Sequence, residues 1–261
     1  MLRWRLTPCR RAGSRAWMSS SPDPSTPFQR SPLSPPDLAR GLYAIVDVTS
    51  LAARGLDPIA FTEAILAARP AALQVRAKAL APADFLGLLR AVGPACRAAA
   101  VPLIANDHVD LALLSGCDGV HVGQDDLAVE RVREMAPGLR VGVSTHDLDQ
   151  LGRALSSRPA YVAYGPVFAT SSKARPDPSV GTDGLALASA RAREAGVKLV
   201  AIGGVTLERA PELRRWAHAS AVIHALLPSG PGRPYDEVTT RAKAFHAALG
   251  GGDDGAPVAD A

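Results

Sequence analysis

Two clusters of acidic and amide side chains follow apolar runs in the middle of the chain. The first run ends in Asn106-Asp107 and the second in Gln124-Asp125-Asp126. An apolar run that ends in polar groups is typical of a parallel strand whose carboxyl end opens into a site. Carboxylates gathered there repel one another unless a divalent cation lies between them, and Mg²⁺ prefers one or two carboxylates together with phosphate oxygens. The two clusters therefore predict a Mg²⁺–phosphate site.

Helix capping is the alternative use of these acids. Asp107 could cap a following helix, and Asp125 and Asp126 could begin the next one, because Asp is a common residue at helix N-termini. One cluster alone favours capping. Two clusters at successive strand ends favour a shared site.

A third polar group lies further upstream, in Gln74-Val75-Arg76-Ala77-Lys78. Side chains alternate along a strand, so Gln74, Arg76 and Lys78 point to one side. A glutamine beside two cations suits a ligand with a heterocyclic edge and a phosphorylated arm. The structural alternative is a buried glutamine with Arg76 and Lys78 on the surface.

Hydroxyl groups and glycines mark the later part of the chain. Ser144 ends another apolar run, and Thr170, Ser172 and Lys173 combine hydroxyls with a cation in a segment that could wrap a phosphate. The adjacent Gly203 and Gly204 could let backbone N–H groups approach a second phosphate, although such pairs also serve simple turns. With no nucleophile–base pair evident, these features favour joining two phosphorylated molecules, with diphosphate as the leaving group.

The elements that must position these residues repeat as a strand followed by a helix. The expected strands are 42–47, 72–76, 102–106, 119–122, 140–144, 161–165, 198–203 and 219–223. The expected helices are 57–69, 82–100, 107–115, 127–136, 147–157, 184–196, 206–215 and 235–249. This alternation predicts an α/β fold with a single (β/α)₈ TIM barrel over 41–249 and its site at the carboxyl ends of the strands. A doubly wound sheet is the alternative, but no glycine-rich dinucleotide fingerprint follows the first strand.

Composition narrows the class of protein. A length of 261 residues with 47% hydrophobic content supports one large core. The first twenty residues carry five arginines and no acid, and the whole chain has a formal charge of +4. The basic excess therefore lies in this first segment, and the rest of the chain gives little support to a nucleic-acid partner. Three scattered cysteines predict a reducing compartment and neither a disulfide framework nor a zinc site. No apolar run is long enough to cross a membrane.

The two ends of the sequence differ from the middle. Residues 1–36 are rich in Arg, Ser and Pro and are expected to be a disordered leader. Its arginine-rich, acid-free start resembles a transit peptide, so organellar targeting stands beside the expected cytoplasmic location. A translation start at Met18 or later is a further alternative. Residues 250–261 are expected to form a flexible tail.

These motifs resemble those of the thiamine phosphate synthase family, also called thiamine-phosphate pyrophosphorylase. The similarity runs in order from about Gly41 to Leu249 through LYAIVD, LQVRAK, PLIANDHVDLAL, DGVHVGQDDL, VGVSTH, YGPVFATSSK and VAIGGV. The combination of ND, GQDD, GPVFxTxSK and AIGG is highly specific. The resemblance implies a (β/α)₈ barrel that joins 4-amino-5-hydroxymethyl-2-methylpyrimidine diphosphate to 4-methyl-5-(2-phosphoethyl)thiazole, giving thiamine phosphate and diphosphate.

The resemblance also implies roles for individual residues. Mg²⁺ would be the cofactor, held by Asp107 and Asp126. The groups that would bind the diphosphate and assist its departure are Arg76, Lys78, Asn106 and Lys173, with Ser144 nearby. Gln74 would meet the aminopyrimidine. The thiazole phosphate would be held by Thr170, Ser172 and the backbone at Gly203 and Gly204. An electron-rich aminopyrimidine can expel diphosphate as a stabilised cation, so positioning and charge stabilisation suffice without an acid–base dyad.

Two positions depart from the family pattern. His108 stands where the family usually has Arg, and His224, at the end of the eighth-strand motif, stands where the family usually has Ser. We expect His224 to border the thiazole phosphate, either pairing with it or adding only bulk.

Two other functions remain open on the same barrel. One is a thiazole tautomerase, which needs no diphosphate site, and the other is a non-catalytic regulator that binds thiamine phosphate. The expected partners are small phosphorylated molecules, with no nucleic acid and no membrane, and homo-oligomer formation stays open.

Overall fold

The computed structural model of the chain describes residues 38–170, 178–230 and 232–252. These residues belong to one compact unit, Pro32–Ala261. The expected leader 1–36 lies outside the described residues. So do Ser172, Lys173 and most of the expected tail 250–261.

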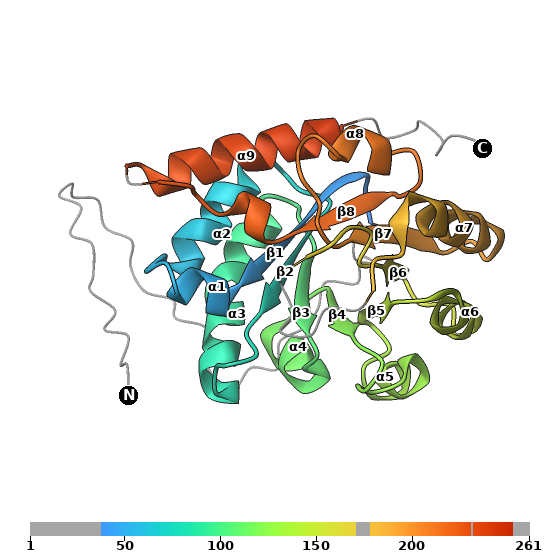
Figure 1. Ribbon diagram of the computed structural model, residues 1–261. Coiled ribbons are helices and arrows are strands. Elements are labelled where there is room, and N and C mark those ends of the chain that lie inside the picture. The colour runs from blue at the N-terminus through green and yellow to red at the C-terminus, as the bar shows by residue number, and fades with distance from the viewer. Residues whose placement is uncertain (1–37, 171–177, 231, 253–261) are drawn as a thin grey trace. The chain divides into compact units, whose positions relative to one another are not determined.

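Eight parallel strands close into a barrel in sequence order, with β8 pairing to β1 (Figure 1). The strands are β1 (Gly41–Asp47), β2 (Ala72–Arg76), β3 (Leu103–Asn106), β4 (Gly119–Val122), β5 (Arg140–Thr145), β6 (Tyr161–Tyr164), β7 (Lys198–Ile202) and β8 (Ala219–Val222). The predicted barrel is therefore confirmed, and each predicted strand is correct to within one residue at either end.

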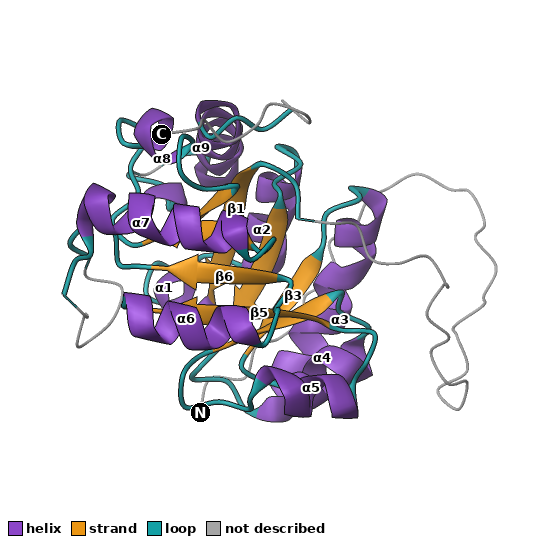
Figure 2. Cartoon of the chain, turned by 90° about the vertical axis from the view of Figure 1, so that its right-hand side faces the viewer, coloured by secondary structure: helices purple, strands orange, loops and turns teal. Residues whose placement is uncertain are grey.

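Helices surround the strands on the outside (Figure 2). They are α1 (Val48–Ala52), α2 (Pro58–Leu66), α3 (Pro82–Ala98), α4 (Val109–Ser115), α5 (Val129–Met135), α6 (Leu148–Ser156), α7 (Gly181–Glu194), α8 (Ala210–Leu213) and α9 (Pro234–Ala248), with the 3₁₀ helix η1 (His224–Leu226). None of the helices among the described residues is long and apolar enough to span a membrane.

Several predicted helix bounds differ from the structure, two of them near the site, and one helix was missed. The helix expected at 206–215 is reduced to α8, which follows the turn that begins at the Gly203-Gly204 pair. The helix expected from residue 107 begins at Val109, because Asp107 adopts a left-handed φ of 64°. The short helix α1 was missed because Val and Thr are weak helix formers, and the Asp47 carboxylate starts it by accepting a hydrogen bond from the backbone N–H of Ser50.

The alternation of side chains in each strand divides the core into two parts. In β1, Leu42, Ala44 and Val46 pack in the cluster under the helices, whereas Tyr43 and Ile45 belong to the cluster inside the barrel. The same alternation carries polar inward residues to the strand ends, so the barrel centre is apolar below and polar above.

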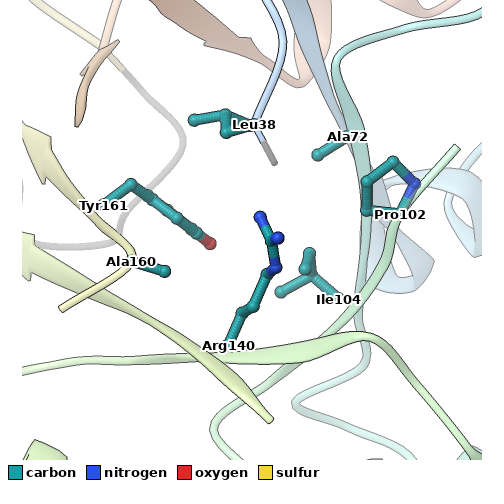
Figure 3. Close-up of a pocket in the computed structure, with 7 residues that line it drawn as sticks. All are labelled: Leu38, Ala72, Pro102, Ile104, Arg140, Ala160 and Tyr161. Carbon is teal, nitrogen blue, oxygen red and sulfur yellow. The ribbon is translucent and has the colours of Figure 1, made fainter. Parts of the chain in front are cut away.

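The amino end of the barrel is filled by mostly apolar side chains together with Arg140 and Tyr161 (Figure 3). Leu38, Ala72 and Ile104 lie here with Arg140 and Tyr161, whose side chains extend toward the middle of the space. The remaining space is about 10 Å³, which is room for about one water molecule. This space is too small for a larger ligand.

Candidate active site

One cavity of about 870 Å³ opens at the carboxyl ends of the strands. It has the size of a typical small-molecule site, and all eight strands contribute to its lining. It brings together every predicted site residue that the structure describes: Gln74, Arg76, Lys78, Asn106, Asp107, Asp126, Ser144, Thr170, Gly203, Gly204 and His224. The geometry of Ser172 and Lys173 lies outside the described residues.

Two carboxylates face each other across the ends of β3 and β4. Burial raises the pKa of Asp107 above its usual value, Lys78 opposes this rise, and the neighbouring Asp126 carboxylate adds to it. The Lys78 ammonium lies 3.5 Å from Asp107 Oδ2, and Asp126 Oδ2 accepts a hydrogen bond of 2.7 Å from the Gly123 N–H. The site therefore holds concentrated negative charge beside one cation.

The capping alternative for these acids was wrong. His108 and Ala128 occupy the N-cap positions of α4 and α5, so neither Asp107 nor Asp126 caps a helix. His108, which departs from the family pattern, lies edge-on to the Phe85 ring with centroids 5.7 Å apart and does not line the cavity.

The donor set fits Mg²⁺ better than a metal bound wholly by protein. Among residues 38–170, 178–230 and 232–252, no group of three or more His, Cys, Asp or Glu side chains could hold a metal ion. The Asp107–Asp126 pair supplies two carboxylates, and their mutual repulsion is relieved when a cation lies between them. Mg²⁺ commonly binds through one or two carboxylates and completes its shell with water and substrate phosphate.

A further carboxylate, which the sequence analysis did not single out, holds Arg76 in place. The Arg76 guanidinium forms an ion pair with Asp47 Oδ2, and Asp47 Oδ1 accepts hydrogen bonds from the Ser50 N–H and hydroxyl at 2.9 and 2.7 Å. Burial opposes ionisation of Asp47, but the Ser50 hydrogen bonds and Arg76 outweigh it and hold the pKa of this carboxyl below its usual value. The sequence contained a signal for Asp47, because this acid ends an apolar run just as Asn106 does.

His224 joins this same group of side chains. Its Nε2 lies 3.3 Å from Ser50 Oγ, while the residue also lines the cavity. The structure thus connects His224 to Ser50 and Asp47 at the start of α1, a contact that strand periodicity could not reveal.

The glycine pair after β7 has a packing role. Gly203 and Gly204 have φ values of 98° and 63°, and a Cβ at Gly203 would lie 2.4 Å from Pro166 Cβ. A Cβ at Gly204 would lie 2.7 Å from Phe168 Cβ. Only glycine lets the segment after β6 approach the β7 end so closely, and this approach positions the chain that leads to Thr170.

Arg209 is a cation that sequence reasoning missed. Its guanidinium lies 4.2 Å from the centre of the Phe168 ring and donates to the Gly204 carbonyl at 2.8 Å. Arg209 also lines the cavity beside the glycine pair, where an anionic group would meet it. Its place in the turn before α8 carried no motif.

Polar side chains, most of them buried, form a hydrogen-bonded line along the wall of the cavity. Gln74 Nε2 donates to the Tyr43 hydroxyl at 2.9 Å, and the hydroxyls of Tyr43 and Tyr161 are 2.7 Å apart. The Tyr161 hydroxyl lies 3.1 Å from His121 Nδ1, and His121 Nε2 lies 2.8 Å from Ser144 Oγ. Burial lowers the pKa of His121 to about 4, so its imidazole is neutral at physiological pH.

Comparison with known proteins places the chain in a family. Residues 42–226 match the model of the family described as thiamine monophosphate synthase. The chain belongs to this family. The family resemblance read from the motifs is therefore confirmed.

Named relatives agree with the family match. The thiamine-phosphate synthase of a Roseiflexus species is 36% identical over 234 residues, which cover 89% of this chain and 94% of the relative. The thiamine-phosphate synthase of Anaeromyxobacter dehalogenans is 40% identical over 72% of this chain and 80% of its own length. The solved thiamine phosphate pyrophosphorylase from Pyrococcus furiosus superposes with a TM-score of 0.68 at 23% identity, covering 80% of this chain and 95% of that one. That last likeness supports the shared barrel fold.

Proposed function

We propose that the chain is a thiamine-phosphate synthase, a transferase that joins 4-amino-5-hydroxymethyl-2-methylpyrimidine diphosphate to 4-methyl-5-(2-phosphoethyl)thiazole. The observation that carries the proposal is one cavity in which the Asp107–Asp126 pair meets the cations Arg76 and Lys78. Carboxylates for Mg²⁺ beside cations for phosphate oxygens suit a reaction that releases diphosphate. Family membership supports the same assignment.

The donor half of the reaction depends on charge stabilisation. Asp107 and Asp126 would hold Mg²⁺, which would supply positive charge to the diphosphate leaving group. Arg76, fixed by Asp47, holds a cation at the cavity wall, and Lys78 adds a second one beside Asp107. Asn106 and Ser144 contribute polar groups from β3 and β5. Preorganised groups of this kind are strongest where charge develops in a partly dry site.

The acceptor half depends on orientation. We assign the thiazole phosphate to the wall formed by Thr170, the Gly203–Gly204 backbone and Arg209, because this wall combines a hydroxyl, open backbone and a cation. Ser172 and Lys173 belong to the same proposed subsite. Gln74 is assigned to the aminopyrimidine. Holding the thiazole nitrogen against the pyrimidine methylene replaces a bimolecular encounter with a positioned one.

A tautomerase or a non-catalytic binding protein would not need this donor half. Neither function requires two carboxylates beside two cations, so the Asp107–Asp126 pair and the fixed Arg76 favour the synthase. A cytoplasmic location is part of the proposal, in keeping with the scattered cysteines and with substrates that are small and highly charged.

The deciding experiment measures diphosphate release with both substrates and Mg²⁺ present. The synthase requires all three components, and release should stop when the thiazole, the pyrimidine or Mg²⁺ is left out. A protein that isomerises a thiazole without releasing diphosphate is a tautomerase. Tight binding of thiamine phosphate without turnover indicates the regulator.

A further inference from the structure

The line of polar side chains along the cavity wall joins two parts of the site. It begins at Gln74 on β2, passes through Tyr43 on β1, Tyr161 on β6 and His121 on β4, and ends at Ser144 on β5. The first four side chains are 1–8% exposed. All five residues line the cavity, and the two ends lie where the proposed pyrimidine and diphosphate would bind.

Packing fixes the middle of this line. The rings of His121 and Tyr161 stack with centroids 5.6 Å apart and an angle of 18° between their planes, and Tyr43 lies at the same centroid distance from Tyr161. A Cβ at Gly142 would come within 2.0 Å of the Tyr161 ring, so the ring lies directly against the β5 backbone. The aromatic groups therefore have little freedom to find other partners.

Counting protons gives the line a direction. Gln74 Nε2 donates to Tyr43, so the single Tyr43 proton goes to Tyr161 and the single Tyr161 proton goes to His121 Nδ1. The neutral imidazole then carries its proton on Nε2 and donates to Ser144 Oγ. The Ser144 proton is left to point into the cavity.

The reverse direction is the other complete solution. In this direction Ser144 donates to His121, and the imidazole donates to Tyr161. Tyr161 then donates to Tyr43, and Tyr43 donates to the side-chain oxygen of Gln74. A mixture of directions leaves a buried donor or acceptor without a partner, which costs roughly 1–3 kcal/mol. The five groups therefore change direction together.

We propose that Tyr43, Tyr161 and His121 are positioning residues that couple the orientation of the Gln74 amide to the direction of the Ser144 hydroxyl. A ligand that fixes the amide then determines whether Ser144 can donate a hydrogen bond to an anion in the cavity. This inference rests on the proposed function for the identity of the two ligands.

The aminopyrimidine selects one of the two directions. It presents an amine donor beside a ring-nitrogen acceptor, and a primary amide pairs with such an edge through its oxygen and one N–H, as Asn and Gln do with adenine. The second N–H of Gln74 is then the donor to Tyr43, which is the orientation in the structure. Binding of the pyrimidine thus leaves the Ser144 proton for the diphosphate.

The test measures the affinity of inorganic diphosphate for the full chain in Mg²⁺, with and without the pyrimidine alcohol that lacks the diphosphate. In the wild type, the pyrimidine alcohol should strengthen diphosphate binding by about five-fold, a typical coupling between sites. Tyr161→Phe keeps the ring but removes the central hydroxyl, so this enhancement should disappear. Tyr43→Phe tests a second link in the same way, in case one variant folds poorly.

Tyr164→Phe is the matched control, because Tyr164 is a buried tyrosine on the same strand whose hydroxyl lies outside this line. It should keep the five-fold enhancement. Nitrogen NMR of His121 gives an independent signature, since the Nε2–H tautomer should be present in the wild type with the pyrimidine alcohol bound.

Each failure points to a different conclusion. If the wild type binds both probes independently, if Tyr161→Phe keeps the enhancement, or if His121 carries its proton on Nδ1 with the pyrimidine bound, the coupling is refuted while the proposed function stands. If the wild type binds neither probe, the proposed function fails, and the coupling fails with it. A merely structural effect of Tyr161→Phe would weaken both probes without changing the enhancement.

Discussion

The two ends of the barrel are built from the same eight strands but are lined by different kinds of side chain. At the amino end, residues such as Leu38, Ala72 and Ile104 leave about 10 Å³ of space. At the carboxyl end, acids, cations and amides surround about 870 Å³. Parallel strands all run the same way, so each gives its first inward residue to one end and its last to the other. The amino end can therefore specialise in closure while the carboxyl end carries chemistry.

The largest loss of activity should come from changing the acids at the carboxyl end. We expect Asp126→Asn to lower Mg²⁺-dependent diphosphate release by about a thousandfold or more, because it removes a carboxylate proposed to hold Mg²⁺, whose charge would be worth several kcal/mol in the transition state. Steady-state assays across a Mg²⁺ titration check this. Asp110→Asn changes an exposed acid on α4 and serves as the control. Unaltered metal dependence in Asp126→Asn would move the metal site elsewhere.

The next effect concerns Asp47, which positions a cation without being assigned to the substrate. Asp47→Asn should reduce kcat/KM by about ten- to a hundredfold, the value of a hydrogen bond to a charged group, because Arg76 loses its partner. Full activity in this variant would show that Arg76 needs no fixed position.

Asp47→Asn also predicts a pH dependence of stability. The pKa of Asp47 is lower in the folded protein than in the unfolded chain, so its ionised form stabilises the fold above the unfolded pKa of about 3.9, and this contribution is lost as the pH falls through the folded pKa. The difference in unfolding free energy between wild type and variant should therefore be constant near neutrality and narrow below about pH 4. Urea titrations at several pH values measure it, and a gap that persists in acid contradicts the assignment.

The amino end should respond in stability and not in chemistry. Ile104 is 2% exposed and lines the sealed end, so Ile104→Ala should lower the unfolding free energy by about 2–5 kcal/mol. The folded fraction should retain the wild-type KM values. A changed KM in the folded fraction would mean that the two ends are not independent.

A smaller effect is expected at His224. His224→Ser restores the family pattern and removes the contact with Ser50, so the KM for the thiazole phosphate should change by only a few-fold, about the value of one neutral hydrogen bond. Steady-state kinetics with the thiazole phosphate as the varied substrate, with and without inorganic phosphate as a competitor, would measure this change. A loss of ten-fold or more would show that His224 itself contacts the phosphate.

The smallest effect should follow removal of residues 1–36. The first described residue is Leu38, which packs at the sealed end, so this truncation leaves the seal complete. We expect unchanged activity and an unchanged melting temperature. Removing residues 1–40 takes Leu38 away and should destabilise the barrel measurably. Insoluble protein after the shorter truncation would show that the leader packs on the barrel.

Sequence periodicity predicted the barrel because each strand is a short apolar run with polar residues at its end. It also placed Gln74, Arg76 and the acids correctly at the cavity, since the order of strands decides which ends meet. The contacts across the barrel were not predictable in this way. Tyr43 and Tyr161 are far apart in sequence, and their meeting depends on the register and closure of the sheet.

Local backbone conformation limited the prediction in other places. Because Asp107 has a left-handed φ, α4 begins at Val109 and not at residue 107. The hydrogen bond from the Ser50 N–H to Asp47 starts α1, and His224 contacts Ser50 there. Arg209 was missed because its place follows from packing on Phe168, which no spacing in the sequence records.

The glycine pair after β7 has a practical meaning for protein engineering. Any side chain at Gly203 or Gly204 would collide with Pro166 or Phe168, so substitutions there would displace a loop before they altered ligand preference. A search for variants that accept a different thiazole should keep the pair fixed and randomise Thr170 and His224, which line the same cavity. In the proposed acceptor subsite, the two glycines are therefore structural positions.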